Sequence, residues 1–258
     1  TAMIDAVLGA ANARGKILSG LPQSGYERLA QGRSVLLMDT GTPPPHPYDD
    51  TAHAAPLSFE FTYGKERVFT ACGTHPFDRE WQDLLRGTAA HNTLSVDDRN
   101  ICEIRPDGHL GRKPRTVTHH REDAKDASLI EATHDGYVPL NGTTHRRRIM
   151  LSAQGHDLRG EESITCSVGL GKALNIALRF HLHPRVLVSQ VRDGREALLR
   201  LPGGAGWRFT HSGGVLALEN SIYMGDGSRP RKTKQIVLYG VMESDRAKIK
   251  WGLRREGR

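Results

Sequence analysis

The sequence lacks several features that would assign it to a familiar class. No apolar run approaches the roughly 20 residues of a membrane-spanning helix. No charged segment followed by an apolar core stands near residue 1, so no signal peptide is visible. Aromatic residues make up only 6% of the chain, and the basic residues are not interleaved with them as in a nucleic-acid-binding platform. We therefore expect no membrane span and no nucleic-acid partner.

Cysteine is also scarce. The three residues, Cys72, Cys102 and Cys166, are odd in number and widely spaced. This pattern does not predict a disulfide framework or a CxxC metal or redox site. We expect buried free thiols, which suit a reducing compartment or a secreted protein that does not depend on disulfides.

Strand patterns, by contrast, recur along the chain. Residues 57–64 and 175–184 alternate apolar and polar side chains, and 28 glycines and 13 prolines are dispersed between such runs. Short strands at regular spacing predict an all-β fold, a large antiparallel, supersandwich-like β-sandwich. Residues 1–13 carry apolar side chains at helical spacing and predict a short N-terminal helix.

The formal net charge is +7. A positive chain favours an anionic partner such as an acidic polysaccharide. Scattered, solvated surface charge is the alternative interpretation, because the basic residues are spread along the sequence.

The segment 85–100, LRGTAAHNTLSVDDRN, stands out among the predicted strands. Leu94 and Val96 share one parity, and His91 has the other, so strand alternation sends the imidazole away from the apolar face. An imidazole placed there can act as base, acid or metal ligand. A hydrogen-bonding role near the start of the strand is the simpler alternative.

TAAHNTLSVDD in this segment resembles the corresponding motif of heparinase II/III-like polysaccharide lyases. Four further stretches resemble the same family in the same order: AHAAPLSFEF (52–61), VFTACG (68–73), HDGYVPLNGTTHRRRIMLSAQGHDLRGEE (134–162) and RFHLHP (179–184). The resemblance implies a C-terminal β-sandwich that follows an N-terminal (α/α) toroid. We interpret the chain as a fragment, with residues 1–20 a remnant of an upstream helical domain and 21–258 the sandwich.

The resemblance implies a carbon–oxygen lyase that cleaves an acidic, uronate-containing glycan by β-elimination. That reaction needs neutralisation of the carboxylate, a base for the α-proton and an acid for the leaving oxygen. In the family the sandwich contributes the equivalent of His91, and the missing toroid contributes the other groups. We expect Arg86, Asn92 and Tyr137 to contact substrate, although an arginine on the surface or an aromatic that anchors a loop fits these positions too. The isolated chain is expected to be inactive.

The resemblance also implies a zinc ion in some members. The ligand positions correspond to His53, His91 and a third residue, an aspartate in those members, which here is Ala71. That departure favours direct action of His91 over metal binding.

Two other functions stay open from the sequence. One is a non-catalytic module that binds anionic glycans through a cationic face. The other is a cupin-like metal enzyme that uses His181 and His183, which share one face of a predicted strand. The resemblance implies a bacterial protein of the periplasm or cell envelope, with a cytoplasmic location as the alternative.

Overall fold

The structure is a computed structural model of the chain, and it describes residues 20–21, 23–75, 77–225 and 229–257. The predicted helix over 1–13 lies outside the described residues, as does nearly all of the predicted helical remnant 1–20. No helix in the described part is long and apolar enough to cross a membrane.

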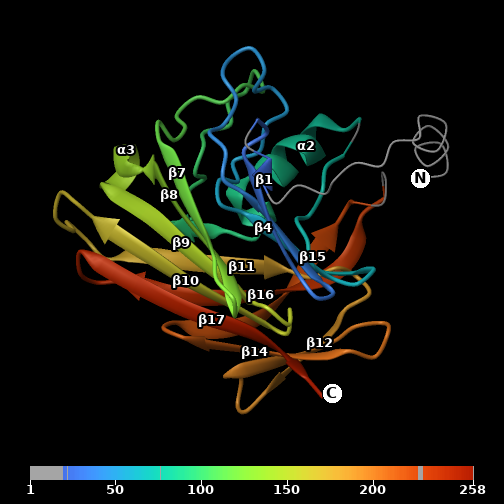
Figure 1. Ribbon diagram of the computed structural model, residues 1–258. Coiled ribbons are helices and arrows are strands. Elements are labelled where there is room, and N and C mark those ends of the chain that lie inside the picture. The colour runs from blue at the N-terminus through green and yellow to red at the C-terminus, as the bar shows by residue number, and fades with distance from the viewer. Residues whose placement is uncertain (1–19, 22, 76, 226–228, 258) are drawn as a thin grey trace.

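The described residues form three antiparallel sheets (Figure 1). The largest has eight strands in the order β12 (Leu187–Val191), β13 (Glu196–Arg200), β14 (Gly206–Ser212), β17 (Arg246–Glu256), β10 (Asp157–Cys166), β9 (Thr143–Ser152), β8 (Ala127–Tyr137) and β7 (Val117–Asp123). The second has five, in the order β1 (Gly20–Leu21), β2 (Tyr26–Gln31), β3 (Ser34–Asp39), β4 (Phe59–Tyr63) and β5 (Glu66–Phe69). The third has four, in the order β15 (Val215–Tyr223), β16 (Arg231–Met242), β11 (Leu174–His181) and β6 (Leu94–Val96).

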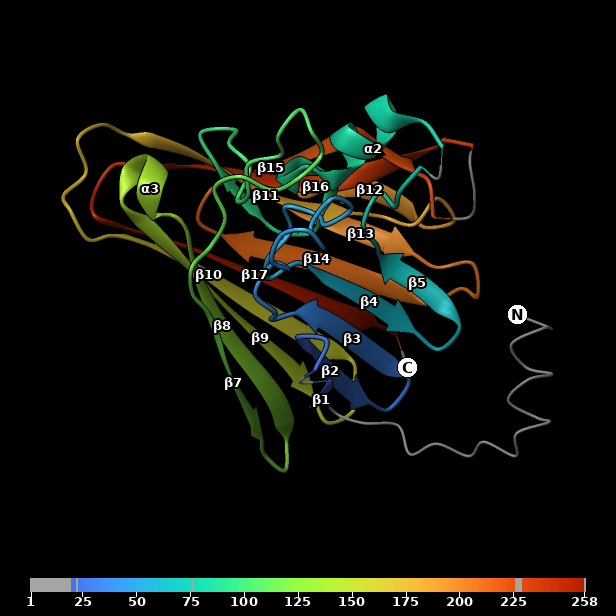
Figure 2. The ribbon, with the colours of Figure 1, turned by 90° about the horizontal axis from the view of Figure 1, so that it is seen from above.

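The two smaller sheets together form the layer that faces the eight-stranded sheet. An isolated bridge between Phe69 and Leu182 joins the end of β5 to the residue after β11. Aromatic side chains then connect this layer to the large sheet: Phe59 stacks on Trp251 with ring centroids 5.5 Å apart, and Phe180 meets Phe209 at 5.0 Å. Figure 2 shows β4 lying over β14 and β17. The predicted antiparallel sandwich is confirmed.

Short helices occupy the connections. The eight-residue helix α2 (Arg79–Arg86) is capped by the Asp78 side chain, which accepts from the Trp81 amide, and the 3₁₀ helix η1 (Thr88–Ala90) follows it directly. The one-turn helix α3 (Val138–Asn141) separates β8 from β9. The segment before His91 is therefore helical.

Candidate functional site

His53 and His91, 38 positions apart in the sequence, lie side by side. His91 follows η1 directly, and His53 lies in the loop between β3 and β4. Their Nδ1 (His53) and Nε2 (His91) atoms are 2.8 Å apart, and the two rings meet edge to face. The structure thus brings together the two histidines that the family resemblance singled out.

Backbone carbonyls fix how protons are arranged in this pair. His91 Nδ1 lies 2.8 Å from the carbonyl oxygen of Gly87, which can only accept, so Nδ1 carries the hydrogen and donates it. In the neutral ring Nε2 is then an acceptor, and it accepts from His53 Nδ1. In this arrangement His53 covers the unprotonated Nε2 of His91.

Burial keeps His91 neutral. Its side chain is 5% exposed, and burial, followed by the proximity of His53, lowers the pKa of His91 to about 3. The pKa of His53 is lowered too, first by burial and then by the Arg86 guanidinium. Near pH 7 both rings are therefore neutral and His91 Nε2 carries no proton, which is the state that a general base needs, although the lowered pKa also weakens its basicity.

Arg86 and Asn92 hold the site together from within. Arg86 is buried, and its guanidinium donates to the carbonyls of Ala52 and Asp49, on either side of the turn that leads to His53. Asn92 is buried as well, with Nδ2 donating to Phe59 and Oδ1 accepting from the His181 amide. Both side chains have backbone partners where the sequence suggested contacts with substrate.

Tyr137 lies away from the cavity. It ends β8 and is fully buried, and its hydroxyl donates to the carbonyl of Leu94 at 3.0 Å. The sequence suggested that Tyr137 contacts substrate. Instead, residues 134–136 continue strand β8, with a register shift between His134 and Tyr137, and the Tyr137 ring is buried.

A buried ion pair behind the site was not predicted. Arg147 and Glu162, on the inner face of the large sheet, are both fully buried and 2.9 Å apart. The Arg147 guanidinium also donates to the carbonyls of Leu57 and Asn92, so it ties the residue after His91 to the sandwich. Burial is the largest single effect and raises the pKa of Glu162, but Arg147, His145 and Trp251 together outweigh it, and the net pKa is lowered.

The described residues do not complete a zinc site on the histidine pair. At the third position Ala71 has no ligand atom. The neighbouring Cys72 thiol lies 3.4 Å from His181 Nδ1, and burial raises its pKa to about 11, so it stays protonated. In the described part of the chain, one group of three or more potential ligands converges, and it contains neither His53 nor His91. We therefore assign no step to a metal ion here.

His181 and His183 do not act as a ligand pair either. His181 Nε2 donates to the Ala89 carbonyl, and its Nδ1 lies 2.7 Å from the Ser221 hydroxyl. The His183 ring packs against Tyr223. This arrangement gives His181 a place in a hydrogen-bond network and does not support the cupin-like alternative.

A cavity of about 830 Å³ opens beside the histidine pair. His53, His91 and Asn92 line it, as does Ala71. Its other ionisable groups are Tyr26, Asp39 and Glu60, and the described lining contains no lysine or arginine. Burial raises the pKa of Asp39 to about 6. The cavity wall is therefore acidic to neutral, although the net charge of the whole chain is positive.

Comparisons with known proteins agree with this fold. A family model described as "Heparinase II/III-like, C-terminal" matches residues 13–252. FtsZ-localized protein C of Caulobacter vibrioides (strain NA1000 / CB15N) is 32% identical over 267 residues, which are 98% of this chain and 46% of that protein. The chain thus spans about half the length of this curated relative.

Solved structures give the same result. A mutant of heparan sulfate lyase HepC from Pedobacter heparinus superposes with a TM-score of 0.77 at 12% identity, over 98% of this chain and 39% of that one. The heparinase III product of the BT4657 gene gives a TM-score of 0.73 at 13% identity, over 97% and 38%. At this identity the likeness shows the shared fold.

Proposed function

Because the chain belongs to the Heparinase II/III-like, C-terminal family, we propose that it is the sandwich part of a polysaccharide lyase. In this proposal the lyase cleaves an acidic, uronate-containing glycan by β-elimination, and an upstream (α/α) toroid supplies the other wall of the cleft. The observation that carries the proposal is the contact of 2.8 Å between the half-buried His53 and the buried His91, at the edge of a cavity of about 830 Å³.

His91 has the chemistry of the base in such a reaction. The base removes the proton on the carbon next to the uronate carboxylate, and the glycosidic bond at the β-carbon then breaks as the double bond forms. Nε2 of His91 is unprotonated, and its Nδ1–H is fixed by Gly87. His53 must turn aside for Nε2 to reach a substrate, so His53 controls access to the base in this scheme.

The remaining roles fall to groups outside this wall. The abstracted proton becomes acidic only if the uronate carboxylate is neutralised, and the described cavity lining has no cationic side chain for that purpose. In our proposal the toroid supplies the group that neutralises the carboxylate and the acid that protonates the leaving oxygen.

A non-catalytic glycan-binding module is the second candidate. It is favoured by the separation of the cationic groups from the cavity. The outer face of the large sheet carries Arg146 and Arg148 on β9, and Arg246, Lys248 and Lys250 on β17. Glu131 and Glu161 offset only part of this charge through ion pairs. The 32% identical relative is named for its localisation with FtsZ and not for a lyase activity.

The two candidates are separated by an assay that compares the full-length protein with the 258-residue chain. Each is incubated with heparan sulfate, alginate and other uronate polymers, and the unsaturated product is followed by its ultraviolet absorbance. We expect turnover by the full-length protein on at least one polymer and none by the chain alone, because the chain has only one wall of the cleft. Robust turnover by the chain alone would contradict an active site that is formed jointly by the sandwich and the toroid.

Binding without cleavage would favour the second candidate. The full-length protein would then retain a uronate polymer on an affinity column, in a salt-dependent way, and form no unsaturated product. The exposed His120 on β7 is a control for the cavity but not for the outer face, because it lies opposite Glu131 on that face.

A further inference from the structure

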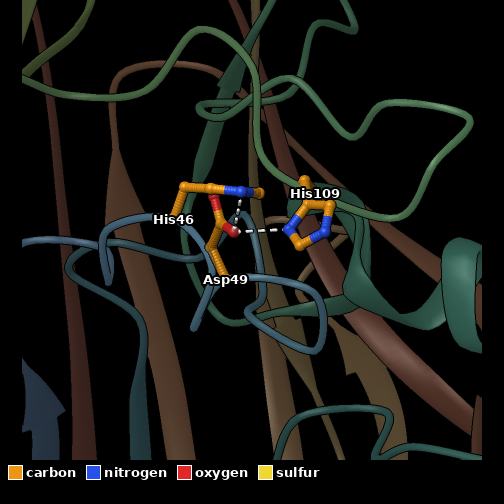
Figure 3. Close-up of side chains that lie close together, drawn as sticks. All are labelled: His46, Asp49 and His109. Atoms are coloured by element: carbon orange, nitrogen blue, oxygen red, sulfur yellow. Dashed lines mark hydrogen bonds and ion pairs between the residues drawn. The ribbon is translucent and has the colours of Figure 1, made fainter.

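Three side chains that the proposed lyase chemistry does not use converge near the cavity (Figure 3). The Asp49 side chain is buried, and its Oδ1 lies 2.7 Å from His109 Nδ1 and 3.8 Å from His46 Nδ1. All three candidate ligand atoms lie within 4.8 Å of one another. His46 and Asp49 belong to the Pro-rich loop after β3, and His109 comes from the segment between β6 and β7.

Neighbouring groups orient the Asp49 carboxylate so that one oxygen faces the imidazoles. The Leu110 amide donates to Oδ2 at 3.2 Å, and the Lys113 ammonium lies 3.6 Å from the same oxygen. Lys113 itself is held by the Pro44 carbonyl at 2.7 Å. The backbone of Asp49 is fixed as well, because its carbonyl accepts from Arg86. Carboxylates that bind metal ions through one oxygen are held by outer hydrogen bonds of this kind.

We propose that His46, Asp49 and His109 form a binding site for a zinc-like transition-metal ion, separate from the His53–His91 pair. Two imidazoles and one carboxylate are a ligand set that zinc prefers, with a fourth position left for water. In a tetrahedral zinc shell with bonds of about 2.0–2.1 Å, ligand atoms lie about 3.3 Å apart. The distances of 2.7 and 3.8 Å fall on either side of that value. His46, with a side chain 71% exposed, is free to make the adjustment.

The site has a structural consequence for the cavity. Pro43 and Pro44, from the loop that carries His46 and Asp49, line the cavity, and His53 follows a few residues later. A bound ion would join this loop to the segment around His109 and so fix the wall next to the histidine pair. The chain with zinc should therefore unfold at a higher temperature than the chain without it, because the ion binds the folded state.

Zinc titration of the metal-free chain tests the site. The chain is stripped with a chelator, dialysed and titrated with zinc chloride in a calorimeter, with calcium chloride as the comparison. We expect about one zinc per chain and no calcium binding, since calcium prefers a shell of oxygen ligands. His46→Ala and His109→Ala should each weaken zinc binding by more than about tenfold.

Two further variants assign the ion to its site. His53→Ala and the surface control His120→Ala should bind zinc like the unmodified chain. Because the His46 side chain is exposed, the His46→Ala variant should fold normally. Thermal unfolding without metal checks this expectation. Absence of zinc binding, or binding that survives His46→Ala and His109→Ala but is lost in His53→Ala, would overturn the proposal.

Discussion

Four of the most deeply buried histidines should make the folded chain sensitive to acid. They are His91, His134, His145 and His181, and each is at most 5% exposed. Burial is the largest cause of a lowered pKa in all four, to about 3 for His91 and about 4 for His181. In the folded state these rings are neutral at pH 7, whereas in the unfolded chain they take up protons near pH 6.5.

The free energy of unfolding should therefore fall as the pH is lowered from 7 to 5. In that range the unfolded state binds more protons than the folded state, and each proton of difference changes stability by ~1.4 kcal/mol per pH unit. Asp39 acts in the opposite direction, because its raised pKa lets the folded state hold a proton up to about pH 6. One carboxyl does not offset four imidazoles.

Urea unfolding at pH 5, 6 and 7 measures this effect. His181→Asn should reduce the dependence on pH, because it removes one of the buried titrating groups, and His120→Ala should leave it unchanged. Equal stability at pH 5 and pH 7 would show that these rings are not buried as neutral groups.

At single positions, the sequence predicted which residues could be reactive better than it predicted the contacts that surround them. The resemblance singled out His53 and His91, and the structure brings them into contact. It also suggested Arg86 and Tyr137 for substrate, and both are buried with backbone partners. Spacing along a sequence does not reveal whether a polar side chain is satisfied by a carbonyl from a distant loop, and that decides which polar residues stay inside.

Strands β10 and β17 show how a glycine shapes the packing of neighbouring elements. Gly160 on β10 is directly opposite Trp251 on β17, and the indole occupies the space beside the glycine. Trp251 in turn stacks on Phe59 and donates to Glu162. A side chain at position 160 would push the indole out of this arrangement.

Gly160→Ala should therefore destabilise the fold by roughly 1–3 kcal/mol, because the added Cβ overlaps the indole ring. Gly252→Ala is the matched control on β17, since a Cβ there meets Thr210 Oγ1 at an ordinary 3.4 Å. Denaturant midpoints of the two variants give the comparison. A Gly160→Ala chain as stable as the Gly252→Ala chain would contradict this account of the strand pair.

Individual strands were more predictable than their order in the sheets. Alternation marked β4 and β11 because each has one buried face. It failed around His91, where the strand β6 has only three residues, all buried, and His91 precedes it. The order β9–β10–β17 joins residues about 90 positions apart, and no local pattern encodes such a pairing.

Across the whole molecule, charge is separated by face. Composition alone predicted an anionic partner from the net charge of +7. The structure places several cations on the outer face of the eight-stranded sheet and two carboxyl groups, Asp39 and Glu60, in the cavity wall. Net charge is a sum over the chain, so it carried no information on this separation. A polyanion can thus be attracted to one face while another face holds the histidine pair.

Turnover of the full-length protein with His91→Ala tests the central claim most directly, namely that His91 is the base in the cleft. We expect turnover on the preferred uronate polymer to fall by about 10²–10⁴. Because His91 is buried and donates to Gly87, the variant should also lose some thermal stability, so turnover is measured at a temperature at which the variant is folded. His53→Ala should be much milder, because it uncovers His91 Nε2 without removing it. Parallel loss of activity and of bound zinc in both variants would instead indicate a shared metal ion. A His91→Ala enzyme with normal turnover and normal unfolding would contradict the account.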